Sequence, residues 1–268
     1  MIKKHIIRCS VILTILIVAK VFAYNMPQAT KSQKVTKSTT TKNTTTTQIT
    51  PSKAAPEFKK AQLNFAKETL PEGDKKVAGK MKRILASFNH RHIQTNRLHQ
   101  KAAEWFPVIE PILAFYGIPN DFKYVPLVES GLQAGVSPKG ATGFWQFMPG
   151  TARTYGLKVN SAVDERKNLR KSTIAACKYI RELHDIFGNW ALAAAAYNVG
   201  DTHMKRQINR QNQNNYFKMK LNRETAGYVY KLISMKAIVE NPAQYGFRAP
   251  RALLAYNAEN EKSEKELN

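Results

Sequence analysis

Glu129 lies in the stretch YVPLVESGL, at the end of an apolar segment near the middle of the chain. Its neighbours Val125, Val128 and Leu132 recur at the spacing of one helix face, which predicts a partly buried helix. A carboxyl group beside such side chains is costly to ionise, and its pKa should therefore rise. A glutamic acid that stays protonated near neutral pH can give a proton to a glycosidic oxygen. The opposite interpretation is an exposed glutamate in a surface ion pair, and the helix taken alone favours it.

Histidine and cysteine form no pattern that would bind a metal or supply a nucleophile. His90, His92 and His99 are two and then seven residues apart, a spacing that does not place three ligands on one helix face. Cys177 lies in an apolar series at helical spacing, where a buried structural thiol is expected. The sequence therefore predicts no metal site.

Three further blocks follow VESGL along the chain, in the order SPKGATGFWQFMPGTARTYGL, AAAAYNVGD and NRETAGYVYKL. Four blocks in this order are far more specific than any one of them. Over about residues 80–247 the sequence resembles the lytic transglycosylase family with an SLT-type domain, most closely its membrane-bound branch D. The resemblance implies an all-α, goose-lysozyme-like helical domain with a substrate cleft between helices.

The resemblance also implies a role for particular residues. Glu129 falls on the family's catalytic acid and base, and Tyr228 on the tyrosine whose hydroxyl faces that acid. The implied substrate-binding positions are Ser137, Gln146, Met148 (through its backbone), Tyr197, Asn198, Glu224 and Tyr228. Side-chain amides both donate and accept hydrogen bonds, which suits the N-acetyl and hydroxyl groups of aminosugars. Trp145 and Tyr197 would offer flat apolar faces to a sugar ring, with a core position as the alternative for Trp145.

The matched blocks contain one acid where a catalytic carboxyl group belongs, whereas most glycosidases use two. The substrate can supply the second function when the N-acetyl oxygen of N-acetylmuramic acid (MurNAc) attacks its own anomeric carbon. Glu129 would first protonate the leaving oxygen and then deprotonate the 6-hydroxyl, which closes a 1,6-anhydro ring. This route needs neither a metal nor an organic cofactor. A hydrolytic muramidase on the same fold and a non-catalytic glycan-binding scaffold are the alternatives.

The elements that must position these residues read as helices, with almost no strand pattern. The predicted helices are about 58–70, 78–103, 105–116, 120–130, from a cap at Ser172 or Thr173 to 187, 190–198 and 223–240. A turn-rich stretch at 133–143 separates Glu129 from the later blocks. Asp164 and Arg166 are expected to form a salt-bridged loop and not to catalyse.

Residues 1–23 have the pattern of a signal peptide: a basic head, a short apolar run and a small-residue ending at Ala23. An uncleaved anchor is the alternative. A membrane span needs about 20 apolar residues, and Lys20 interrupts the run before that length is reached. We therefore expect export to the periplasm or cell envelope of a bacterium.

The rest of the chain divides by composition. Residues 24–56 are rich in Thr, Ser and Lys and contain no acid, which predicts a disordered linker. Residues 57–250 are long enough for one catalytic domain with a sizeable core. Residues 251–268 form a polar tail.

The chain carries 42 Lys and Arg against 19 Asp and Glu, a formal net charge of +23. Such an excess indicates an anionic partner. The basic residues are scattered and form no recognisable nucleic-acid module, so we expect no nucleic acid. Export makes peptidoglycan glycan strands, with their peptide carboxylates, the better partner. The basic linker would add peripheral association with the membrane or wall, and we expect a monomer.

Overall fold

The computed structural model describes residues 63–88 and 95–245. The chain divides into two units, Met1–Pro56 and Glu57–Asn268, and every described residue belongs to the second. The predicted signal peptide, linker and polar tail lie outside the described residues, as do His90 and His92. In the described part, no three His, Cys, Asp or Glu residues gather as a metal site would require.

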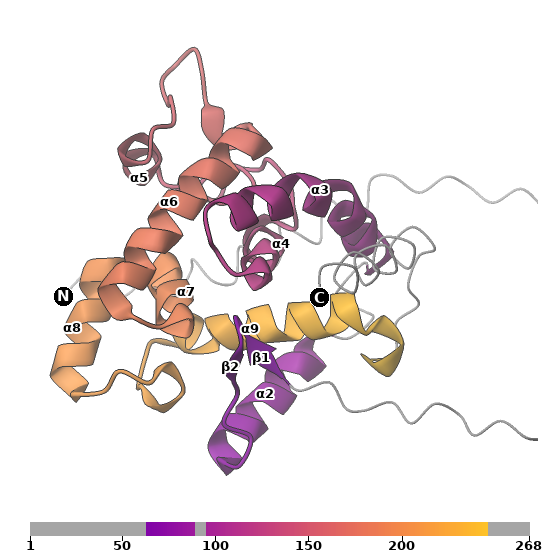
Figure 1. Ribbon diagram of the computed structural model, residues 1–268, viewed down its shortest axis with the longest axis vertical. Helices are drawn as coiled ribbons and strands as arrows, with labels where there is room; N and C mark the ends of the chain where they lie inside the picture. The colour runs from indigo at the N-terminus through magenta and orange to yellow at the C-terminus, as the bar shows by residue number, and fades with distance from the viewer. Residues whose placement is uncertain (1–62, 89–94, 246–268) are drawn as a thin grey trace, which may run out of the picture. The chain divides into compact units, whose positions relative to one another are not determined.

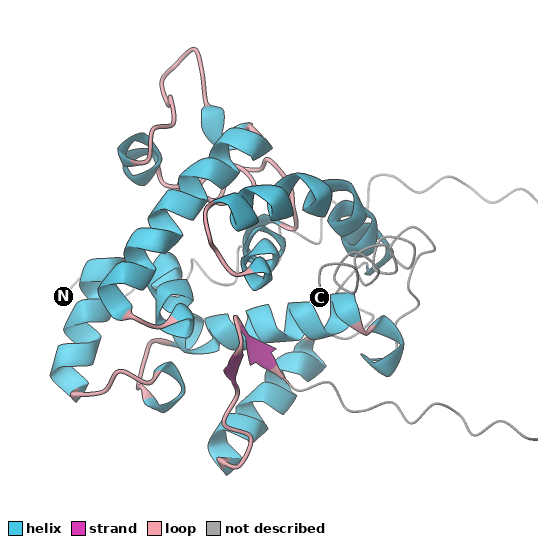
Figure 2. Ribbon diagram, viewed as in Figure 1, coloured by secondary structure: helices cyan, strands magenta, loops and turns pink. Residues whose placement is uncertain are grey.

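The described residues are mainly helical, which confirms the predicted all-α class (Figures 1 and 2). A small hairpin, β1 (Asn64–Phe65) and β2 (Glu68–Thr69), precedes the helices. The α-helices are α2 (Lys75–Ser87), α3 (Thr95–Phe115), α4 (Tyr124–Ser130), α5 (Pro149–Thr154), α6 (Leu169–Phe187), α7 (Trp190–Val199), α8 (Asp201–Gln211) and α9 (Arg223–Glu240). Short 3-10 helices are η1 (Asn120–Lys123), η2 (Glu165–Lys167), η3 (Tyr216–Lys218) and η4 (Pro242–Tyr245).

Helix α9 packs against α2, α4 and α7, while α6 packs against α3 and α7. Most of α9 is buried, including Tyr228, Val229 and Leu232. Helix α7 is buried from Ala191 to Ala196, and its alanines let neighbouring helices come close. Helices α4 and α7 are therefore both held against α9.

The predicted helix at 58–70 is wrong over its described part, which forms the β1–β2 hairpin. Ala66 and Lys67 both have positive φ, 52° and 65°, as the turn of a tight hairpin requires. Tertiary contacts outweigh local propensity here. The Ala66 N–H donates to Asp121 Oδ2 at 2.7 Å, and Phe65 is fully buried.

Other element boundaries also differ from those predicted. The expected break near residue 104 is absent, and α3 is continuous from Thr95 to Phe115. It includes Pro107 and Pro111, which lie on the exposed face, while the opposite face of the helix is buried in the core. Helix α6 begins at Leu169 and not at residue 172 or 173, because the Asn168 side chain caps it by accepting from Lys171 N at 2.9 Å. Helices α5 and α8 were not predicted. Within the described ranges, no helix is long and apolar enough to cross a membrane.

Candidate active site

Glu129 lies one residue before the end of α4, and the helix stops there for a local reason. Gly131 and Leu132 both adopt positive φ, 61° and 55°. Their N–H groups donate to the carbonyls of Leu127 and Pro126, which closes the last turn. Leu132 is fully buried, so the chain is fixed directly after the acid.

Helix α9 brings a tyrosine to this acid. The Tyr228 hydroxyl donates to Glu129 Oε1 at 2.6 Å, although 99 residues separate the two in sequence. Tyr228 is only 2% exposed. Burial and the neighbouring Glu129 carboxylate raise the pKa of the Tyr228 phenol well above its usual value, so it remains a hydrogen-bond donor.

Burial raises the pKa of Glu129 above its usual range. The Tyr228 hydrogen bond acts against this by stabilising the carboxylate, Glu224 reinforces the rise, and Lys231 opposes it. Burial is the largest of these effects, and the net shift is upward. A carboxyl group of this kind holds its proton closer to neutral pH, as a general acid must.

The segment 135–147, here called the Gln146 loop, lies against the end of α4. Ser130 Oγ lies 2.8 Å from Phe144 O and 3.0 Å from Pro126 O, so the residue after Glu129 ties the two segments together. Gly143 has φ 84°, and a Cβ there would lie 1.8 Å from Arg166 O. Glycine is therefore required at this position.

Gln146 is the one residue of this loop other than glycine that has a positive φ, 49°. Its Nε2 donates to Gly143 O at 2.8 Å, which holds the amide in place. Ser137 Oγ accepts from Ala141 N at 3.0 Å, so the predicted sugar-contacting serine also closes a turn of its own loop. Met148 follows the loop as the residue before α5 and is 46% exposed.

Asn198, at the end of α7, is joined to the start of α9. Its Nδ2 donates to Glu224 Oε1 at 3.2 Å, and its Oδ1 accepts from Thr225 Oγ1 at 3.0 Å. The preceding Tyr197 is half-buried and donates to Trp145 O at 2.8 Å. Burial and then the nearby Glu129 charge raise the pKa of Tyr197.

The structure thus brings Tyr197, Glu224 and Tyr228 near Glu129, with Asn198 attached through Glu224. The expectation for Trp145 is wrong. Its ring is fully buried and its Nε1 donates to Thr173 Oγ1 at 2.9 Å, so it has no face to offer a sugar.

Lys231 was missed by the sequence reasoning. It lies three residues after Tyr228 on α9 and lowers the pKa of Glu129. That spacing along one helix, inside the block NRETAGYVYKL, was the signal that could have found it.

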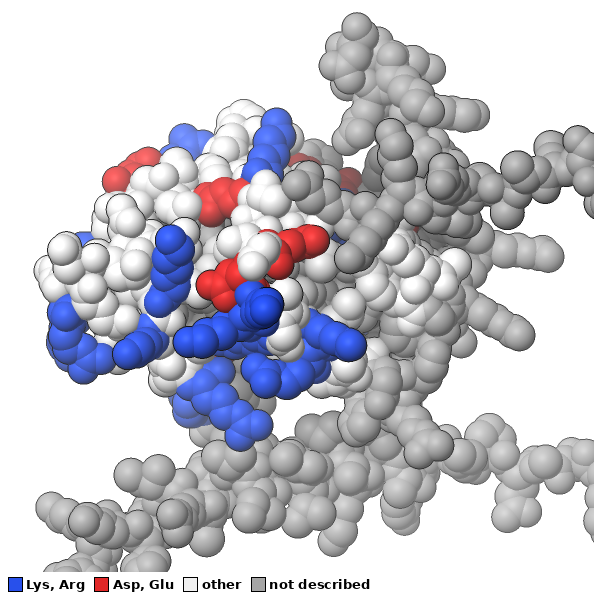
Figure 3. All heavy atoms as spheres, turned by 90° about the horizontal axis from the view of Figure 1, so that it is seen from below, with Lys and Arg blue, Asp and Glu red and all other residues white. Residues whose placement is uncertain are grey.

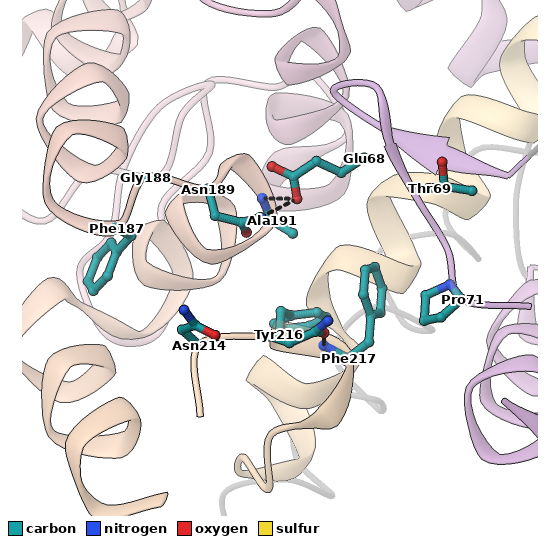
Figure 4. A pocket seen from close by; sticks show the side chains of 11 residues that line it. Glu68, Thr69, Pro71, Phe187, Gly188, Asn189, Ala191, Asn214, Tyr216 and Phe217 are labelled. Atoms are coloured by element: carbon teal, nitrogen blue, oxygen red, sulfur yellow. Dashed lines mark hydrogen bonds between the residues drawn. The ribbon is translucent and has the colours of Figure 1, made fainter. Parts of the chain in front are cut away.

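One described cavity, of about 480 Å³, lies at the other end of α7 (Figure 4). The rings of Tyr216 and Phe217 and the amide of Asn214 line it. On its wall, Glu68 accepts from Asn189 Nδ2 at 2.7 Å and from the first N–H groups of α7. This carboxylate therefore stabilises the helix start. None of the predicted site residues lines the cavity.

The face shown in Figure 3 is rich in lysine and arginine. Helix α2, lowest in Figure 1, contributes exposed Lys75, Lys76, Lys82 and Arg83 and contains no acid. Acidic residues also lie on this face, but the excess of basic side chains favours an anionic polymer or surface as partner.

In this helical domain a tyrosine donates to a carboxyl group with a raised pKa. Such a group can act as the general acid that glycan-cleaving enzymes require. Residues 107–220 match the family described as Transglycosylase SLT domain, which supports the resemblance carried by the first three blocks; the block with Glu224 and Tyr228 lies beyond the matched residues.

The proteins similar to the chain include two relatives and one solved structure. Membrane-bound lytic murein transglycosylase D of Escherichia coli (strain K12) is 34% identical over 139 residues, 50% of this chain and 31% of that protein. A protein of Alteromonas sp. (strain M-1) described as a tributyltin chloride resistance protein is 32% identical over 130 residues, 47% of this chain and 63% of its own length. The chain therefore spans less than a third of the first relative. An inactive mutant of the lytic transglycosylase Slt from Pseudomonas aeruginosa has a TM-score of 0.40 and 22% identity, over 55% of this chain and 25% of that one.

Proposed function

We propose that this chain is a peptidoglycan lytic transglycosylase. It cleaves the β-1,4 bond between MurNAc and N-acetylglucosamine without water and leaves 1,6-anhydro-MurNAc ends. The observation that carries the proposal is the partly buried Glu129, with a raised pKa and a tyrosine hydroxyl 2.6 Å away, in a chain with an SLT domain.

In the first step the protonated Glu129 gives its proton to the leaving glycosidic oxygen. The N-acetyl oxygen of MurNAc attacks the anomeric carbon from the other side, so the substrate supplies the second group. In the second step the Glu129 carboxylate takes the proton of the 6-hydroxyl, and that oxygen displaces the N-acetyl group. Glu129 ends protonated, as it began.

Tyr228 fits both steps. Its buried phenol donates to Oε1, which leaves Oε2 to carry and receive the transferred proton. The same hydrogen bond steadies the carboxylate that forms after the first step. Among the remaining predicted positions, Gln146, Tyr197 and Asn198 would hold the aminosugar, and Ser137, Met148 and Glu224 would border it.

A hydrolytic muramidase is the second candidate, and Glu224 is the observation that favours it. This exposed carboxylate is close enough to raise the pKa of Glu129, so it could position a water. Its Oε1 is already engaged by Asn198, which suits a positioning role better.

The site of action follows from the substrate. The Escherichia coli relative is named a membrane-bound murein transglycosylase. We place this chain in the bacterial cell envelope, exported through residues 1–23 and associated with the wall through its basic residues. Its partner is the peptidoglycan glycan strand and not nucleic acid, and it acts as a monomer without metal or cofactor.

Digestion of purified sacculi in oxygen-18 water, followed by mass spectrometry, tests the reaction. Anhydro-MurNAc ends without label are expected, because a held hydroxyl can reach effective molarities of about 10⁵–10⁸ M. Mostly labelled reducing ends would identify the muramidase, and no cleavage at all would favour a glycan-binding scaffold.

A further inference from the structure

Arg166 is a buried arginine, 7% exposed, whose side chain joins two segments of the fold. Its Nε and Nη2 donate to Asp164 Oδ1 and Oδ2, both at 2.8 Å. Its Nη1 donates to Gly140 O at 3.1 Å and to Phe147 O at 3.0 Å. The two-point ion pair with Asp164 fixes the guanidinium plane and so aims Nη1 at the two carbonyls.

The two carbonyls belong to different parts of the Gln146 loop. Gly140 lies in its first turn, between Ser137 and Ala141. Phe147 ends the loop and is paired with Thr142 by two backbone hydrogen bonds of 3.0 and 3.1 Å. One side chain thus fastens the turn and the end of the loop to each other.

The main chain of Arg166 makes a third contact. A Cβ on Gly143 would lie 1.8 Å from Arg166 O, so the two backbones are already as close as glycine permits. Gln146 stands between the contacts at Gly143 and Phe147 and keeps its positive φ of 49°. Backbone strain of this kind persists where the surroundings enforce it.

The Gln146 loop is in turn attached to the helix that carries the acid. Phe144, between the same contacts, lies with its carbonyl 2.8 Å from Ser130 Oγ, the residue after Glu129. A chain of direct contacts therefore runs from Asp164 through Arg166 and the loop to the end of α4.

We propose that Arg166 is a positioning residue for catalysis, which sets the Gln146 loop against the end of α4, next to Glu129. The proposal rests on the proposed function for its catalytic part. Arg166 does not touch the reacting atoms. It acts through Gln146, which would hold the substrate, and through Phe144 and Ser130, which adjoin the acid.

The informative variant is Arg166→Lys in the full chain. Lysine keeps the charge but cannot both pair with Asp164 at two points and reach two carbonyls. A shift of about 1 Å in a positioned group can cost about 10²-fold, so we expect kcat/KM on glycan fragments to fall about 30- to 100-fold. Lys171→Gln is the matched control, because it removes the neighbouring Lys171–Glu165 pair, in which Lys171 is exposed; its activity should stay within about twofold of wild type.

Two readouts separate positioning from mere stability. The pH limb on which activity falls as Glu129 loses its proton should move to lower pH in Arg166→Lys, because a displaced loop leaves the acid more exposed. Hydrogen exchange of the amides in 140–147 should speed up at least tenfold in this variant, while α6 and α9 stay protected.

Each result decides a separate point. An unmoved pH limb with wild-type kcat/KM would overturn the catalytic part of the proposal. Unchanged exchange in 140–147, measurable even in an inactive protein, would overturn the loop part. A wild type without any cleavage would instead overturn the proposed function. Asp164→Asn should reproduce the Arg166→Lys effects, and the double variant should add little to either.

Discussion

Replacing Glu129 by glutamine removes the proton and leaves the shape. The amide keeps an oxygen that can accept from Tyr228 at the position where Oε1 accepts now, 2.6 Å from the phenol. Loss of general acid–base catalysis typically costs about 10²–10⁴-fold, and in the proposed mechanism Glu129 serves two steps. We therefore expect turnover on sacculi to fall by about 10⁴-fold or more while glycan binding is retained.

The same variant should be more stable than wild type at neutral pH. Glu129 has a raised pKa in the folded state, so protonation of this group stabilises the fold. That contribution to the free energy of unfolding is complete below the pKa of the unfolded chain, 4.5. That contribution is lost as the pH rises through the folded pKa. Each unit of elevation corresponds to about 1.4 kcal/mol, which would shift Tm by about 3–5 °C in a domain of this size. Glutamine does not titrate and loses nothing over this range.

Thermal melts of both proteins from pH 4 to 8 measure this directly. The Tm difference should be near zero at pH 4 and grow in favour of Glu129→Gln as the pH rises. Glu104→Gln, at an exposed acid on α3, is the control for the loss of one carboxylate from the domain. A glutamine variant that is less stable at pH 8, or that retains turnover within tenfold of wild type, would refute the assignment of Glu129.

Three further predictions concern the surroundings of the acid and the chain before it. Tyr228→Phe should lower kcat by about 10- to 100-fold. It should also move the high-pH limb upward, because the hydrogen bond from Tyr228 lowers the pKa of Glu129 and its removal lets that pKa rise; an unmoved limb in rate–pH profiles would count against this. Gly143→Ala should cost about 2 kcal/mol or more in denaturant unfolding, because its Cβ meets a backbone oxygen at positive φ, whereas Gly150→Ala, at an open position, should cost little. Deleting residues 24–56 should weaken sacculus binding mainly at low salt in co-sedimentation, and leave turnover of soluble fragments unchanged.

The sequence could predict those parts of the site that depend on one helix at a time. Glu129 at the end of an apolar helix, and the Glu224–Tyr228 spacing within α9, both follow from period and stop signals. The contact between Tyr228 and Glu129 could be stated only through a family resemblance, because 99 residues separate the partners and no local rule joins them.

The errors in the predicted fold also come from contacts between residues that are distant in sequence. The hairpin at 64–69 forms because Asp121 and the α7 start supply partners for Ala66 and Glu68, and local propensity contains neither. Trp145 was expected to be a sugar platform because its ring offers a flat apolar face, although a core position was the alternative. Its burial depends on Thr173 in α6, a partner 28 residues away.

Helix α9 explains why the site can be both buried and able to react. It carries Tyr228 and Lys231, which stabilise the charged form of Glu129, and Glu224, which destabilises it. Burial alone would hold the acid protonated and make it a poor base in the second step of the proposed mechanism. The donors on α9 offset part of that cost, so the pKa lies above the usual glutamate range without leaving the carboxylate inaccessible. A single acid that must give and then take a proton needs this balance, and the packing of α9 against α4 maintains it.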